Sequence, residues 1–160
     1  MKTVGIAMLF GLCCLIGFRL GAKKTAQLRT VQSLRRDVQL LSERVGSGGS
    51  TLLEIAGEMN GTLSEILRIY LEKLDEGAAE TDAAAFALEC LRGSGNVQAG
   101  VRMFLAGLST ASRSDLIART KALSPMLERA ETEAEAEEKQ ARVLRISGVL
   151  TGAGLAILLL

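Results

Sequence analysis

The side chains that could do chemistry in this 160-residue chain are mainly carboxylates, because the sequence contains no histidine. The absence of histidine removes the commonest general acid–base, the usual catalytic triads and histidine-containing metal sites. Glu54, Glu58 and Glu65 lie near one another in the sequence, but helix capping and solvation account for them, and no metal-ligand spacing stands out. We therefore predict no catalytic residue, no metal and no cofactor, and an enzyme working at a membrane is the disfavoured alternative.

Glycine and cysteine give two further candidate sites, and neither pattern supports one. The GSGGS stretch at 46–50 is glycine-rich, but no G-x-x-x-x-G-K-[ST] pattern is present, so we predict a flexible break rather than a phosphate-binding loop. Cys13 and Cys14 are adjacent in an apolar run, and adjacent cysteines rarely bridge each other. Cys90 lies on an apolar helical stripe, where a packed thiol is expected rather than a reactive one.

Charged residues that a partner protein could recognise form the remaining candidate site. The net charge is +1 and aromatic residues make up only 3% of the chain, so nucleic acid is not a predicted partner. Asp115 near a helix N-terminus has a competing role, because a carboxylate there interacts favourably with the helix dipole. The glutamate-rich stretch from Glu128 to Glu138 also fits a solvated helix face. The predicted partner-binding residues are Arg35, Arg36, Ser114, Asp115, Glu131 and Glu135.

Apolar stretches lie near both ends of the chain. Between Lys2 and Lys23 only Arg19 is charged, and from Val143 to Leu160 only Arg145 is charged. About 20 apolar residues cross a bilayer as a helix, and an arginine can extend its side chain to the interface. We therefore predict transmembrane helices at 1–22 and 143–160. The alternatives are a cleaved signal peptide for the first and a buried core helix for the second.

The predicted orientation follows from the basic residues beside these two segments. They lie on the side of the middle segment, 23–142: Arg19, Lys23, Lys24, Arg29, Arg35 and Arg36 after the first apolar stretch, and Lys139, Arg142 and Arg145 before or within the second. Such a bias places the basic side in the cytoplasm. The middle segment is thus predicted to be cytoplasmic. The alternative is a membrane-anchored sensor or scaffold whose helical bundle lies outside the cell.

Helical periodicity dominates the middle segment. A narrow heptad seam is formed by Val31, Leu34, Val38, Leu41 and Val45. The predicted fold is all-α: an antiparallel helical bundle and coiled-coil stalk between N- and C-terminal transmembrane helices.

Shorter helices are predicted between the two long ones, with capping boxes at Thr51–Glu54 and Thr62–Glu65. The long helix from Arg113 should be kinked or split at Pro125. The predicted apolar faces are Leu63, Ile66, Leu67, Tyr70, Leu71 and Leu74; Ala83, Phe86, Ala87, Cys90 and Leu91; and Val97, Val101, Phe104, Leu105 and Leu108.

Several segments in this order resemble the stage III sporulation protein AB family of endospore-forming bacteria. They are LRTVQSLRRDVQLLSERV at 28–45, TLLEIA at 51–56, LSTASRSD at 108–115 and the C-terminal run from Pro125, PMLERAETEAEAEEKQARVLRISGVLTGAGLAILLL. Leu52 replaces a proline that is usual in the family, and Arg119 stands where glutamine is usual. The resemblance covers nearly the whole chain.

The resemblance implies a role as well as a fold. The family belongs to the apparatus that connects the mother cell to the forespore, and it is similar to the helical cytoplasmic domains of the type II secretion platform protein. It implies a platform in the mother-cell-side membrane around the forespore, with a cytoplasmic ATPase and channel subunits as partners. Self-association into a homo-oligomer is compatible with this role.

Overall fold

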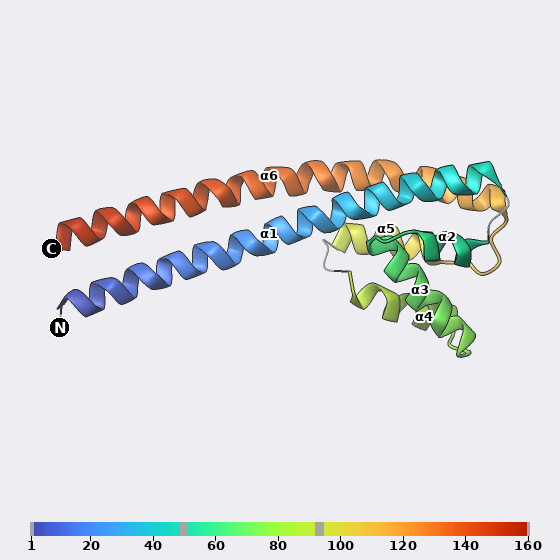
Figure 1. Ribbon diagram of the computed structural model, residues 1–160, viewed down its shortest axis with the longest axis horizontal. Helices are drawn as coiled ribbons and strands as arrows, with labels where there is room; N and C mark the ends of the chain where they lie inside the picture. Colours follow the sequence, from blue (N-terminus) through green and yellow to red (C-terminus); the bar gives the residue numbers. More distant parts are fainter. Residues whose placement is uncertain (1, 49–50, 92–94, 160) are drawn as a thin grey trace. The chain divides into compact units, whose positions relative to one another are not determined.

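In the computed structural model, all regular secondary structure among the described residues is helical (Figure 1). This confirms the all-α prediction. The structure describes residues 2–48, 51–91 and 95–159, apart from the side chains of 2–7, 9, 10, 13, 14, 16, 17, 20, 148 and 151–159. The helices are α1 (Lys2–Ser47), α2 (Leu52–Glu58), α3 (Thr62–Asp75), α4 (Glu80–Glu89), α5 (Gly95–Leu105) and α6 (Arg113–Leu159).

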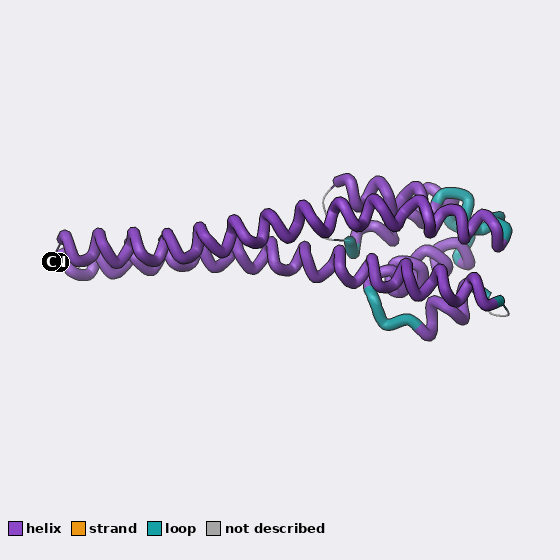
Figure 2. Tube along the Cα trace, turned by 90° about the horizontal axis from the view of Figure 1, so that it is seen from above, coloured by secondary structure: helices purple, strands orange, loops and turns teal. Residues whose placement is uncertain are grey.

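The chain divides into two compact units, and the two long helices contribute to both. We call Arg29–Thr132 the central unit, and Met1–Leu28 with Glu133–Leu160 the terminal unit. The turns that interrupt the helices, drawn in teal in Figure 2, all belong to the central unit.

The heptad seam of α1 is the centre of the core in the central unit. All five seam residues are buried, and Leu34 and Leu41 have no exposed surface. The neighbouring part of α6 runs antiparallel to it, because Arg35 contacts Glu131 whereas Arg113 contacts the main chain of Val45. The prediction of a seam on an antiparallel helix pair is therefore confirmed.

The apolar faces of the short helices are confirmed in α3 and α5 and in part in α4. Of the stripe predicted there, Ala83, Ala87 and Leu91 are buried and Cys90 packs against the core, whereas Phe86 is 51% exposed. The buried face of α4 runs through residues 83, 84, 87 and 88. Phe86 therefore lies on the outer side of the helix.

Of the two predicted capping boxes, the first is confirmed and the second is wrong. The main-chain N–H of Thr51 donates to the Glu54 carboxylate at 2.8 Å, and the N–H of Glu54 donates to the Thr51 hydroxyl at 3.3 Å. Thr62, in contrast, is already inside α3, whose N-cap is Gly61 and has no side-chain cap. The N-terminus of α3 is capped from α1 instead, as described below.

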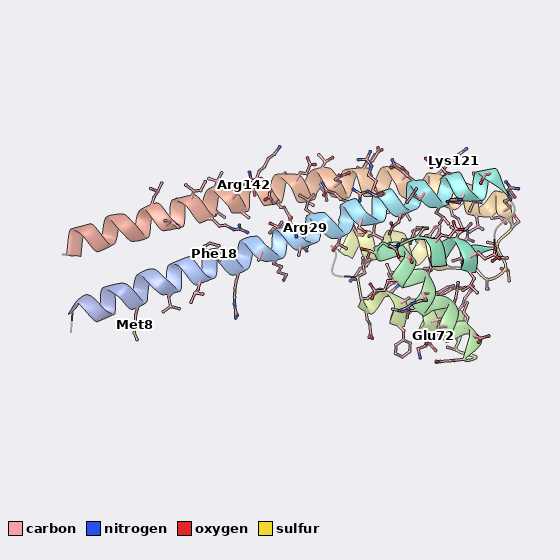
Figure 3. The ribbon with its side chains drawn as sticks, viewed as in Figure 1. Met8, Phe18, Arg29, Glu72, Lys121 and Arg142 are labelled. Carbon is pink, nitrogen blue, oxygen red and sulfur yellow. The ribbon has the colours of Figure 1, made fainter. Side chains whose placement is uncertain are left out.

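Pro125 does not divide the last helix, because α6 is continuous from Arg113 onwards. A proline removes the amide donor that would bond to the carbonyl four residues earlier, here that of Lys121. Lys121 is exposed (Figure 3), so water can satisfy this carbonyl and the helix can continue.

The terminal unit consists of an antiparallel helix pair, in which the first part of α1 and the last part of α6 lie side by side (Figures 1 and 2). Lys24 Nζ lies 2.6 Å from Glu137 Oε2. The Arg145 guanidinium lies 5.9 Å from the centre of the Phe18 ring. It also packs on Gly21, where a Cβ atom would overlap it. Gly21 therefore leaves the space that the Arg145 guanidinium occupies.

No helix in the part of the chain whose side chains are described has a stretch long and apolar enough to cross a membrane. The described residues therefore do not support the transmembrane helices predicted at 1–22 and 143–160. Much of both predicted segments, including Cys13 and Cys14, lies outside the described side chains.

Candidate functional site

Two of the predicted partner-binding residues bind each other. Arg35 Nη1 donates to Glu131 Oε2 at 2.5 Å, and its Nη2 donates to Glu128 Oε1 at 3.1 Å. The hydrogen bond to Glu131 is the main cause that raises the pKa of Arg35 above its usual value. Both side chains are largely covered, with 36% of Arg35 and 16% of Glu131 exposed. The pair links α1 to α6, which gives both charges a structural role, and binding of a partner by either residue stays a prediction.

Arg36 and Glu135, the two predicted charges that lie nearest to this pair in sequence, are not part of it. Arg36 is exposed in the central unit, where its charge opposes in part the rise that burial causes in the pKa of the neighbouring Asp37. Glu135 is exposed in the terminal unit. Both therefore remain accessible, but they belong to different units.

Ser114 and Asp115 begin α6, where Asp115 is used in a cap. The Ser112 main-chain N–H donates to Asp115 Oδ2 at 3.0 Å, and the Asp115 N–H donates to the Ser112 hydroxyl at 3.2 Å. The hydrogen bonds from Ser112 lower the pKa of Asp115. The Ser114 hydroxyl lies 2.8 Å from that of Ser112. The structural role that competed for Asp115 is therefore the one it has.

Asp37 is the most important polar residue that the sequence did not single out. Its buried carboxylate accepts a hydrogen bond at 2.8 Å from the main-chain N–H of Leu63, and nearby Ser33 accepts one from Thr62. These acceptors on α1 satisfy the free N–H groups at the start of α3. Gly61 allows this approach, because a Cβ atom there would overlap the Asp37 carboxylate. Burial raises the pKa of Asp37, against the opposing effects of the Leu63 hydrogen bond and Arg36.

Two arginines of α6 cap the C-termini of other helices. Arg113 donates to the carbonyls of Val45 and Gly46 at 2.7 and 2.6 Å, near the end of α1. Arg119 donates to the carbonyls of Phe104 and Ala106, at the end of α5. A cation at a helix C-terminus also interacts favourably with the helix dipole. Arg119 thus has a structural contact of its own.

A further polar contact joins α3, α4 and the turn after α5. The Glu80 carboxylate accepts hydrogen bonds from the hydroxyls of Ser109 and Tyr70 at 2.7 and 3.0 Å, and from the Gly107 N–H at 3.3 Å. These bonds, led by that of Ser109, lower the pKa of Glu80. Burial and the adjacent Glu80 carboxylate raise the pKa of the Tyr70 hydroxyl well above its usual value. The network positions helices and shows no activated nucleophile.

The described residues offer no arrangement for metal or thiol chemistry. No cluster of three or more acidic or cysteine ligands is present among them. Cys90 is half-buried, its thiol donates to the Ala87 carbonyl at 2.9 Å, and burial raises its pKa. A raised pKa lowers the thiolate fraction, so the thiol packs rather than reacts.

An apolar groove between α5 and α6 is the feature of the central unit that polar contacts do not explain. Its volume is about 520 Å³. The residues that line it are Gly100, Met103, Phe104, Ala106, Arg119, Ala122, Leu123 and Met126. Met103 is 72% exposed and Met126 is 42% exposed. Exposed methionines that line a groove make it the candidate binding surface of the central unit.

The charges of residues 90–127 contain a signal for this groove that helical periodicity does not show. Asp115 is the only acidic residue between Glu89 and Glu128, whereas that stretch contains five basic residues. A charge bias of this kind beside exposed methionines indicates a surface rather than a core.

Comparison with known proteins identifies the family. The model of the family described as "Stage III sporulation protein AB" matches residues 2–160. No curated protein and no solved structure matches the chain. Because the match covers the chain from its second residue to its last, the chain belongs to the stage III sporulation protein AB family and has a role in stage III of sporulation.

Proposed function

We propose that the chain is a non-catalytic platform of the apparatus between mother cell and forespore, and that its central unit docks a cytoplasmic ATPase. The observation that carries the proposal is that the main polar groups of the central unit make structural contacts inside it, whereas its apolar groove is exposed. Arg35, Asp37, Glu80, Arg113 and Arg119 all bind helix ends or other side chains within it. They hold a rigid helical unit, and an exposed apolar groove remains for a partner.

The terminal unit supports a second part of the proposal, contact with the membrane and with channel subunits. It exposes large apolar side chains on both of its helices: Met8, Leu12, Leu15 and Phe18 on α1, and Val143, Leu144, Ile146, Val149 and Leu150 on α6. Figure 3 labels Met8 and Phe18 among them. Exposed apolar surface of this extent is typical of lipid or protein contact. We therefore propose that this unit holds the platform at the mother-cell-side membrane around the forespore.

Co-purification with the companion ATPase tests the docking proposal. The full-length chain in detergent, immobilised through a tag, should retain the purified ATPase in at least one of three states: without nucleotide, with ATP analogue or with ADP. An unrelated detergent-solubilised protein should retain none. Failure of the wild-type chain to retain the ATPase in all three states would overturn direct docking.

The proposed cytoplasmic side of the central unit is tested by labelling. Cys13, Cys14 and Cys90 are replaced, and one cysteine is introduced at the exposed Ser47. A membrane-impermeant maleimide should label it only after permeabilisation. Labelling in intact cells would instead favour the sensor or scaffold with an external bundle.

A further inference from the structure

The floor of the groove is set by how closely α5 approaches α6. A Cβ atom at Gly100 would lie 3.2 Å from the terminal methyl group of Met126 and 3.3 Å from Leu123 Cδ1. Gly100 therefore lets the helices come together beneath the groove. Beside it, Met103 is 72% exposed and Met126 is 42% exposed. Methionine side chains are flexible and polarizable, so they adapt to the shape of an incoming apolar surface.

The groove also has the right length for a short stretch of helix. Its lining on α6 extends from Arg119 to Met126, and its lining on α5 from Gly100 to Ala106. Seven residues of helix measure about 10 Å, which is about two turns. An amphipathic helix places its apolar side chains at i, i+3, i+4 and i+7, which is also about two turns.

Basic residues adjoin the groove lining in sequence. Arg102 and Lys121 are exposed, and they precede the groove residues Met103 and Ala122. Arg119 lines the groove and also donates to the carbonyls of Phe104 and Ala106. Residues 90–127 contain one carboxylate, that of Asp115, which caps the start of α6 with Ser112. A partner with acidic residues flanking its apolar face would therefore meet complementary charge.

We propose that the groove between α5 and α6 binds an acidic amphipathic helix of a partner protein. This inference rests on the proposed function, because it takes the partner to be a protein of the same apparatus. Apolar side chains of that helix pack between Met103 and Met126, and its carboxylates face Arg102 and Lys121. The apolar contacts supply the affinity, and the charges select the acidic helix over a basic one.

The test uses two helical peptides and the full-length chain in detergent. Both peptides have leucine at i, i+3, i+4 and i+7, and the remaining surface positions carry glutamate in one and lysine in the other. Fluorescence anisotropy should show the acidic peptide binding at least about tenfold more tightly than the basic one, with affinity falling as salt is added. Absence of binding by the acidic peptide, or equal binding of both peptides, overturns the proposal.

Matched variants locate the site. Met103→Glu should weaken binding of the acidic peptide about tenfold or more, whereas Leu53→Glu, the same change at an exposed leucine of α2, should leave it unchanged. Arg102→Glu with Lys121→Glu should reduce the preference for the acidic peptide. Arg68→Glu, an exposed arginine of α3, is the charge control. Equal effects of the Met103 and Leu53 variants would overturn the site.

Two other occupants are outcomes of the same experiment. If Met103→Glu abolishes concentration-dependent self-association in sedimentation while peptide binding is unchanged, the groove takes a second copy. If the variant abolishes flotation with anionic vesicles instead, the groove takes a lipid surface. Both results overturn the assignment. The peptide measurement contains no ATPase, so its failure is distinguishable from failure of the platform proposal.

Discussion

The central and terminal units use the same two helices, yet their apolar side chains have different surroundings. In the central unit the seam of α1 is buried, with Leu34 fully covered. In the terminal unit large apolar residues such as Leu12 and Leu144 are mostly exposed. The difference lies in the number of helices, because α2 to α5 add their apolar faces to the core only in the central unit. Two helices alone leave an outer face for another surface to cover.

The arginines of the two units also differ in what they contact. In the central unit Arg113 and Arg119 bind main-chain carbonyls at helix ends. In the terminal unit Arg145 lies against Phe18 and Gly21, and its buried Nε finds no hydrogen-bond acceptor among the described residues. Arginine thus binds helix ends in the central unit, whereas in the terminal unit Arg145 packs against a ring and a glycine, and Lys24 makes the ion pair with Glu137 between the helices.

The largest expected effect comes from truncating matched leucines in the two units. Leu34→Ala should lower the free energy of unfolding by about 2–5 kcal/mol, because it opens a cavity in a packed core. Leu144→Ala, at a side chain that is 69% exposed, should change it by less than about 0.5 kcal/mol. Chemical denaturation of the full-length chain in detergent measures both. A larger loss at Leu144 than at Leu34 would contradict the contrast between the units.

A smaller loss is expected at the cap that α1 provides for α3. Asp37→Ala should cost about 1–3 kcal/mol, because the buried N–H of Leu63 loses its acceptor. Asp37→Asn should recover much of this loss, because the amide oxygen still accepts the bond and burial no longer opposes a charge. Gly61→Ala should also destabilise by displacing the carboxylate.

A double-mutant cycle checks the geometry of this cap. Gly61→Ala combined with Asp37→Ala should cost less than the sum of the single changes, because the overlap disappears with the carboxylate. Additive losses would show that the two residues do not meet. Arg36→Ala, at the exposed neighbour of Asp37, is the control and should be nearly neutral.

The smallest effect concerns Glu80 and depends on pH. Its pKa is lowered in the folded protein, so its stabilising effect is present above the ordinary value of 4.5 and is lost as the pH falls through the lowered value. The melting temperature of Glu80→Gln should therefore lie below that of the wild type at pH 7. The gap should narrow as the pH falls below about 4.5. A difference in melting temperature that does not change with pH would rule out the ionised network of Glu80 with Ser109 and Tyr70.

The features that could be predicted from the sequence depend on patterns of residues that lie close together in the chain. The heptad seam, the succession of helices and the Thr51–Glu54 box all arise from residues within a few turns of one another. The contacts that the sequence did not predict join distant residues. Leu63 is capped from 26 residues away, and Arg35 meets Glu131 from 96 residues away. No local spacing reveals such pairs, so the ion pair of Arg35 and Glu131 was not predicted.

The most direct test of the account compares ATPase retention by three full-length variants. The exchange of Arg35→Glu with Glu131→Arg restores opposite charges across α1 and α6, and the account predicts that it retains the ATPase as the wild type does. Met103→Glu should reduce retention about tenfold, and Leu53→Glu should not. Loss of retention in the charge exchange, with Met103→Glu unaffected, would place the docking surface on the ion pair and contradict the account.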